Sequence, residues 1–205
     1  MNNQYHDPVL LQESVDGLNI KENGVYVDVT FGGGGHSKEI LKRLGKEGRL
    51  FAFDQDEDAL ANAIDDKRFE LINQNFQFLK QYLKFYGIRK VDGILADFGV
   101  SSHQFDEAKR GFSIRYDAEL DMRMNRNNKL SAYEVVNTYS TEDLATVLFQ
   151  YGELRNAKAL AKAMVENRAE KPIKTTEQLK TALQRFLPKM KENKILAQIY
   201  QAIRI

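Results

Sequence analysis

The sequence predicts an α/β fold, with a parallel, doubly wound sheet interrupted by a mostly helical block. Short runs of β-branched and aromatic residues alternate with helical segments through the first half of the chain, with short connections between them. Such alternation is typical of a parallel sheet with helices on both faces. Four consecutive glycines join the first of these runs to a helix, which is where open α/β sheets bind nucleotide-like ligands. After residue 104 the strand pattern stops and helical segments follow.

The composition is that of a globular protein, with 42% hydrophobic and 29% charged residues in a chain of 205. This length suits one domain, or one domain with a sizeable insertion. The absence of cysteine excludes disulfides and thiolate metal sites, and three scattered histidines do not predict a metal site. The sequence shows neither an apolar stretch of membrane-spanning length nor a signal pattern at its start, so a cytoplasmic location without a membrane partner is expected.

The net charge of +1 is unevenly distributed along the chain. Residues 1–104 hold 12 Lys and Arg against 16 Asp and Glu, a balance of −4. Residues 105–205 hold 18 against 13, or +5, and residues 155–205 alone hold 12 against 4, or +8. An acidic nucleotide-binding half joined to a basic helical half suits a polyanionic substrate. A solvated helical surface that happens to be basic explains the charge equally well.

The glycine turn organises the first half of the chain. Val25, Val27 and Val29 lie in a short apolar run that predicts a buried parallel strand. The glycines at 32–35 follow it, and such a run allows positive φ and a close approach of a ligand to the backbone. Ser37 is the expected N-cap of a helix over residues 37–44.

The second predicted strand, residues 49–53, ends in Asp54. This acid lies about 20 residues beyond the glycines, where a carboxylate in such folds accepts hydrogen bonds from ribose hydroxyls. The turn does not follow the pattern G-x-G-x-x-G, because Ser37 and Lys38 stand where its last glycine would be. It therefore fits an adenosine-containing ligand without phosphates, such as S-adenosylmethionine. The alternative is a plain turn followed by a surface aspartate.

The remaining elements follow from periodicity and from turn residues. In the first half, an extended arm from His6 and a short helix near residues 14–18 are expected to lie over the glycine turn. Further helices are expected over 56–64 and 76–86, and further strands over 69–73 and 91–96, the last ending at Asp97. Residues 105–128 have no clear period and predict a loop. Helices are then expected over residues 130–136, 140–151, 156–168, 175–187 and 194–205.

The expected domain organisation is a sheet domain over residues 1–104 and a helical insertion over residues 105–205. Only four parallel strands are visible, whereas a doubly wound sheet of this type would have roughly three more. The last predicted helix has no glycine or cap at its end. We therefore expect the helical block to interrupt the sheet, and the C-terminal strands to be missing from this chain.

Four segments together resemble one family. They are Thr30-Phe-Gly-Gly-Gly-Gly-His-Ser37, Asp97-Phe-Gly-Val-Ser-Ser-His-Gln104, Arg110-Gly-Phe-Ser113 and Leu120-Asp-Met-Arg-Met124. The chain resembles the ribosomal RNA small subunit methyltransferase H family, also called MraW, from His6 to Ile205. The resemblance implies a class I, Rossmann-like methyltransferase fold. It also implies methyl transfer from S-adenosylmethionine to the exocyclic N4 of a cytosine in 16S ribosomal RNA of the small subunit.

The resemblance also implies a cofactor site. The glycine turn would supply close backbone contacts, Asp54 would bind the ribose, and Phe76 would line the adenine. Gln104 has both a donor and an acceptor for the amino-acid end. Each has a structural alternative, since Phe76 could pack in the core, His36 could pack the helix start and Asp97 could be a turn residue. The implied cofactor-binding residues are Gly34, Gly35, His36, Asp54, Phe76, Asp97 and Gln104.

The implied reaction is a direct displacement, in which the cytosine amine attacks the methyl carbon of a sulfonium. Asp97 and Ser101 are the candidate catalytic residues, with Asp97 as an acceptor for the amine; Ser101 and Ser102 could instead cap a following helix. The absence of cysteine excludes covalent attack on the ring by a thiolate. The base must be presented out of any stack. The residues expected to hold the RNA are Arg110, Arg115, Arg123, Arg126, Arg155 and Lys158, together with Lys162 and Lys174.

Two departures from the family pattern bear on this hypothesis. His103 stands where the family usually has proline, and the family's segment Ser-Phe-His-Ser-Leu-Glu-Asp is absent. The chain is therefore expected either to bind cofactor with an incomplete RNA site and without activity, or to form a homodimer that covers exposed apolar surface. Two other functional classes stay open. One is an NAD-dependent oxidoreductase, and the other is a non-catalytic RNA-binding module whose affinity for RNA does not change when S-adenosylmethionine is added.

Overall fold

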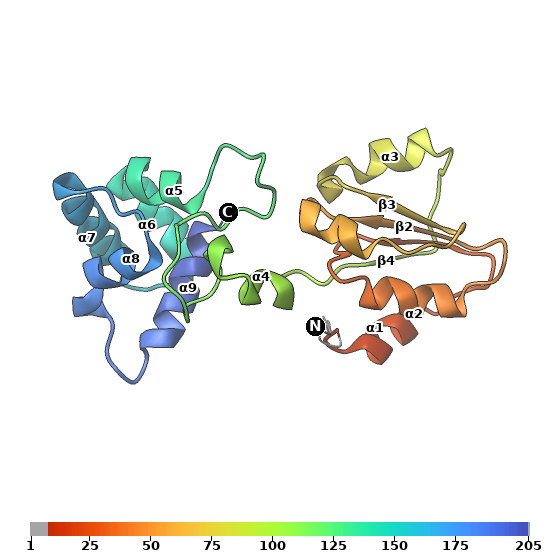
Figure 1. Ribbon diagram of the computed structural model, residues 1–205, viewed down its shortest axis with the longest axis horizontal. Helices are drawn as coiled ribbons and strands as arrows, with labels where there is room; N and C mark the ends of the chain where they lie inside the picture. Colours follow the sequence, from red (N-terminus) through yellow and green to blue (C-terminus); the bar gives the residue numbers. More distant parts are fainter. Residues whose placement is uncertain (1–7, 205) are drawn as a thin grey trace. The chain divides into compact units, whose positions relative to one another are not determined.

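The computed structural model describes residues 8–204 of the chain. The chain divides into two compact units, residues 1–103 and 104–205, and each is described by itself (Figure 1). The expected arm at His6 lies outside the described residues. Across residues 8–204 no helix is long and apolar enough to cross a bilayer. In the same range, no cluster of three His, Cys, Asp or Glu side chains could hold a metal ion.

The first unit is a four-stranded parallel sheet in the order β3-β2-β1-β4, which confirms the predicted parallel, doubly wound architecture. In register, Asp28 at the end of β1 pairs with Ala52 of β2 and with Leu95 of β4. The strands are β1 (Val25–Asp28), β2 (Arg49–Phe53), β3 (Phe69–Ile72) and β4 (Gly93–Leu95). The helices are α1 (Leu11–Gly17), α2 (Gly35–Arg43), the 3₁₀ helices η1 (Glu57–Asn62) and η2 (Phe76–Phe78), and α3 (Leu79–Phe85).

The sheet buries both of its faces because its strands have apolar residues at consecutive positions. Tyr26 and Leu50 point to the face covered by α1 and α2, where Ile40 packs against them. The next residues along the strands, Val27 and Phe51, point to the face covered by α3 (Figure 1). Successive side chains of a strand alternate between faces, so continuous apolar strands require helices on both sides.

Two predictions about the first unit are wrong. Ser37 does not cap α2; the N-cap is Gly34 in a left-handed conformation, and the Ser37 hydroxyl donates to Asp28 instead. The helix expected over 56–64 is the 3₁₀ helix η1, which begins after Asp56, whose carboxylate accepts the N–H of Asp58 at 3.1 Å. This is an N-cap bond, which supports the start of a helix. However, η1 buries only Ala59, so little packing stabilises a longer regular α-helix there.

The second unit contains helices and, in its described residues, an isolated antiparallel bridge between Glu119 and Thr175 in place of any strand. Helices α6 (Thr141–Gln150) and α7 (Ala157–Glu170) pack on each other. Their contact is formed around the fully buried Leu144, Leu148, Leu160 and Met164. Two predicted caps are confirmed, since Ser140 accepts the N–H of Asp143 and Thr175 that of Gln178. The elements are α4 (Ser102–Asp106), η3 (Ala108–Arg110), α5 (Ala132–Thr138), α6 (Thr141–Gln150), α7 (Ala157–Glu170), α8 (Thr176–Ala182), η4 (Gln184–Phe186) and α9 (Glu192–Ile203).

Candidate functional site

The glycine turn lies between the carboxyl end of β1 and the first turn of α2. Gly32 and Gly34 have φ of 51° and 75°, in the left-handed region that favours glycine. A Cβ on Gly34 would lie 2.9 Å from the ring of Phe31, whereas one on Gly32 would meet nothing within 4 Å among the described residues. The turn is therefore packed on one side and open on the other. On Gly35, a Cβ would collide with Pro8, so this part of the N-terminal arm does lie over the turn.

Asp54 is joined to the glycine turn by hydrogen bonds. Its Oδ2 accepts the N–H of Gly32 at 2.8 Å, and its Oδ1 accepts the N–H of Asp56 at 2.9 Å. The Asn62 amide donates to the carbonyl of the same glycine at 3.0 Å, which fixes the turn from η1. Burial raises the pKa of the Asp54 carboxyl above its ordinary value. The N–H of Gln55 also bonds to this carboxylate. Since a carboxylate has about four acceptor positions, about one remains for a hydroxyl donor.

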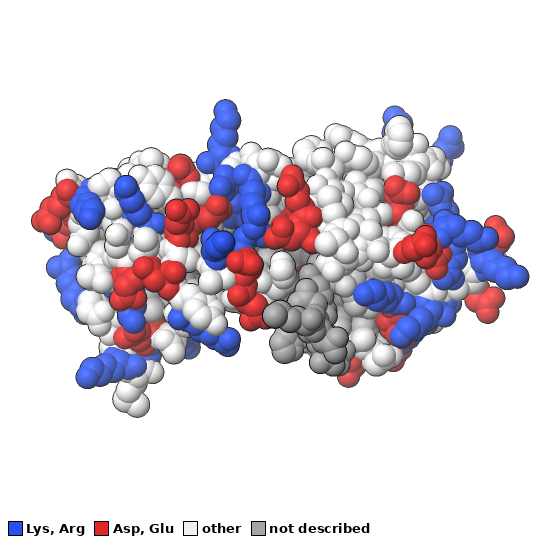
Figure 2. Space-filling view, in the orientation of Figure 1, with Lys and Arg blue, Asp and Glu red and all other residues white. Residues whose placement is uncertain are grey.

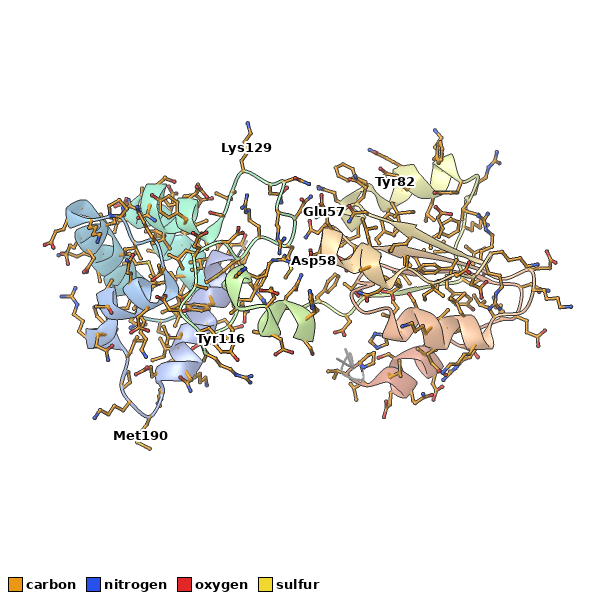
Figure 3. The ribbon with its side chains drawn as sticks, viewed as in Figure 1. Glu57, Asp58, Tyr82, Tyr116, Lys129 and Met190 are labelled. Carbon is orange, nitrogen blue, oxygen red and sulfur yellow. The ribbon has the colours of Figure 1, made fainter. Side chains whose placement is uncertain are left out.

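Asp97 approaches the same turn from the end of β4. Its backbone N–H donates to the Thr30 hydroxyl oxygen at 2.8 Å, and its side chain is exposed. In Figure 3, Glu57 and Asp58 are labelled on η1, the segment that follows the other acid, Asp54. The structure therefore brings the two strand-end acids that were singled out in the sequence to one turn.

Asp28 is a functional candidate that the sequence reasoning missed. It is fully buried at the end of β1, and its Oδ1 accepts the N–H of Thr30 at 3.0 Å. Its Oδ2 accepts the hydroxyl of Ser37 at 2.8 Å. The chain of contacts continues from the Thr30 hydroxyl to the N–H of Asp97. The sequence did contain a signal for this role, because Asp28 is an acid within an apolar strand, just before the turn. A carboxylate buried in a strand needs hydrogen-bond partners.

We expect Asp28→Ala to lower the free energy of unfolding by about 1–3 kcal/mol, because it leaves the Thr30 and Ser37 donors without an acceptor. The isosteric Asp28→Asn is the matched control. Burial raises the pKa of Asp28 in the folded state. The free energy of unfolding of the wild-type protein therefore falls as pH rises through that raised pKa. The stability of Asp28→Asn relative to wild type should therefore increase with pH. Urea denaturation between pH 4 and pH 8 measures both effects, and a difference independent of pH would contradict the assignment.

The other predicted cofactor-binding residues differ in their exposure and in the unit to which they belong. His36 is 5% exposed, and within the part of the chain that the structure describes its Nε2 makes no hydrogen bond. Phe76 is not a core residue, since it is 43% exposed at the start of η2. Ser101 directly precedes α4, which agrees with the capping alternative. Gln104 is 6% exposed in α4 and belongs to the second unit.

Two of the arginines expected to hold RNA instead fold the loop in which they lie. Arg110 is 2% exposed, and its guanidinium donates to the carbonyls of Arg123 and Met124 at 2.9 and 3.3 Å. Arg123 forms two bonds to the Asp121 carboxylate, at 2.8 and 2.7 Å. Arg110 is therefore a structural residue of the loop and not an accessible phosphate contact. The burial of Arg110 could not be predicted from the sequence, because residues 105–128 show no hydrophobic period that would indicate which side chains are buried.

The other basic candidates lie on the surface. Arg115, Arg126, Arg155 and Lys158 are exposed, the last within α7. Figure 2 shows Lys and Arg interspersed with Asp and Glu over much of the second unit, and one group of adjoining basic side chains near the middle of the view. Lys129, labelled in Figure 3, projects from the loop between η3 and α5. These side chains remain candidates for contacts with a polyanion.

A family model and two curated relatives all match this chain over nearly its whole length. The family model described as "MraW methylase family" matches residues 3–205. Ribosomal RNA small subunit methyltransferase H of Flavobacterium johnsoniae is 67% identical over 202 residues, which are 98% of this chain and 67% of that relative. The protein of the same name from Cytophaga hutchinsonii is 56% identical over 203 residues, 98% of this chain and 68% of that relative. The chain thus spans about two thirds of the length of these relatives.

Proposed function

The chain belongs to the MraW methylase family, and from this we propose that it takes part in methyl transfer from S-adenosylmethionine to the exocyclic N4 of a cytosine in 16S ribosomal RNA. The observation that carries the proposal is the joining of two strand-end acids to one glycine turn. Asp54 accepts the N–H of Gly32, and Asp97 donates its own N–H to Thr30. Relatives named as ribosomal RNA methyltransferases supply the substrate class.

The residues present fit S-adenosylmethionine. The side of the turn at Gly32 gives a ligand access to the backbone, since none of the described residues 8–204 would contact a Cβ there within 4 Å. The remaining acceptor position of Asp54 suits a hydroxyl of a ribose. The buried Nε2 of His36, at the start of α2, is a polar atom that a ligand could satisfy. When bound, the cofactor supplies an electrophilic methyl group on a sulfonium.

This chain's own residues would position the nucleophile. The lone pair of cytosine N4 is delocalised into the ring, so an acceptor near the amine helps it towards tetrahedral geometry. The exposed Asp97 carboxylate at the end of β4 is our candidate acceptor, because its backbone is fixed to Thr30 while its side chain is accessible. Holding the amine in line with the methyl carbon supplies much of the rate.

Transfer of a tritium-labelled methyl group by a full-length version of the protein tests the proposed function. Small ribosomal subunits would be incubated with the enzyme and labelled S-adenosylmethionine, and their 16S RNA digested to nucleosides. We expect the label in cytidine methylated at N4, and none when Asp97→Asn replaces the wild type. Label in another nucleoside, or in ribosomal protein, would contradict the assignment.

A further inference from the structure

Two exposed aromatic rings touch each other in the first unit. The ring centres of Phe76 and Phe98 are 5.5 Å apart, with 44° between their planes. Both side chains are largely exposed, at 43% and 69%. An exposed pair of phenyl rings keeps apolar area in water, which a planar ligand could cover. Phe98 directly follows Asp97 in the chain.

The contact spans the carboxyl edge of the sheet. Phe76 follows β3 and Phe98 follows β4, and these are the two outer strands in the order β3-β2-β1-β4. Three inter-strand steps separate them, about 14 Å at the usual spacing. For the rings to meet, the segments after β3 and β4 must converge above the ends of β2 and β1. Asp54 and the glycine turn begin at those two ends.

Both segments are fixed by hydrogen bonds near the rings. Before Phe76, the Asn75 amide donates to the side-chain oxygen of Gln55 at 2.9 Å, and Gln55 is the neighbour of Asp54. Before Phe98, the N–H of Asp97 donates to Thr30 at 2.8 Å. The aromatic pair is thus attached on one side to the proposed ribose-binding segment and on the other to the glycine turn. A base one glycosidic bond from a ribose at Asp54 would come within reach of these rings.

We propose that Phe98 forms the second aromatic wall of an adenine subsite, opposite Phe76, and so helps to determine specificity for an adenine-containing cofactor; this rests on the proposed function. An aromatic base between two rings needs about 7 Å between their centres, because each stacked contact takes about 3.5 Å. The observed 5.5 Å is shorter, so binding requires one ring to turn aside. Phe98 is the more exposed of the two and has the room to do so.

Calorimetric titration of S-adenosylmethionine into the wild-type chain and into Phe98→Ala tests this proposal. Loss of one aromatic–base stack should weaken affinity by about 5- to 100-fold. Phe98→Tyr keeps the aromatic face and should restore affinity to within about threefold of wild type. The matched control is Phe85→Ala, which removes a ring that is 82% exposed on α3. It should bind as wild type does.

A fluorescence measurement adds a readout that a purely structural role would not move. The chain has no tryptophan, so Phe98→Trp and Phe85→Trp each introduce a single reporter. Saturating S-adenosylmethionine should quench the indole at position 98 and leave that at position 85 unchanged.

The outcomes separate this proposal from the proposed function. If wild type binds and Phe98→Ala binds equally well, the aromatic wall is wrong and the proposed function stands. If the Phe98→Ala variant of the full-length protein keeps cofactor affinity but loses RNA binding, Phe98 contacts the target base and the adenine assignment is overturned. If wild type shows no binding at all, the proposed cofactor site and the aromatic wall both fail.

Discussion

Asp54→Ala should abolish saturable binding of S-adenosylmethionine, lowering affinity by at least about 100-fold. The carboxylate is placed to accept a hydroxyl hydrogen bond from a ribose, and a bond to a charged acceptor contributes about 1.5–3 kcal/mol. It also holds the N–H of Gly32 at 2.8 Å, so the substitution also loosens the turn that the cofactor must approach. Isothermal titration calorimetry at neutral pH measures the loss directly.

Two further variants separate ribose binding from turn geometry. Asp54→Asn retains one acceptor and should bind with intermediate affinity, whereas Glu57→Ala removes an exposed acid from η1 and should bind as wild type does. Burial raises the pKa of Asp54, so wild-type affinity should fall on acidification at a higher pH than for an exposed aspartate. A wild-type affinity that is insensitive to pH, with Asp54→Ala still binding, would remove Asp54 from the site.

Asp97→Asn should lower the rate of methyl transfer by a full-length version of the protein at least about 100-fold, the range for losing a group that acts on the reacting centre. The side chain is exposed beside the glycine turn, while its backbone N–H is held by Thr30 at 2.8 Å. The asparagine keeps that backbone bond and the side-chain size but loses the anionic acceptor. Single-turnover transfer to small-subunit RNA, with cofactor affinity measured in parallel, checks this prediction.

The role of Asp97 is decided by whether Asp97→Asn lowers the rate of methyl transfer more than it lowers the affinity for the cofactor. We expect cofactor affinity to fall by no more than about tenfold in Asp97→Asn, the loss of roughly one hydrogen bond. Asp65→Asn, which neutralises an exposed acid between η1 and β3, is the matched control and should transfer at the wild-type rate. Near-normal turnover by Asp97→Asn would refute an acceptor role, and a parallel collapse of affinity would make Asp97 a binding residue only.

The sheet could be predicted because its signals are local and repeated. Val25, Val27 and Val29 mark a buried strand, and the glycines from Gly32 require the turn that follows. The position of Asp54 at the next strand end then follows from parallel pairing, since the carboxyl ends of parallel strands lie at one edge. The caps at Ser140 and Thr175 were predictable for the same reason, as a cap depends on residues three apart.

The remaining features depend on contacts between residues far apart in the sequence. Ser37 has the chemistry of a helix cap, but the buried Asp28 takes its hydroxyl, and only the packed fold brings them together. Arg110 looked like an exposed cation because its loop has no period, yet it is buried against the carbonyl of Arg123. The contact of Phe76 with Phe98 joins segments on opposite edges of the sheet, which no local pattern could indicate.

Titration of S-adenosylmethionine into the 205-residue chain by calorimetry tests the central claim most directly, with NAD as the parallel ligand and circular dichroism as the check on folding. The glycine turn, with Asp54 and Asp97 joined to it, predicts saturable binding at one site per chain and no heat from NAD. A folded chain that binds NAD, or that binds neither ligand, would contradict the assignment of this turn as a methyl-donor site.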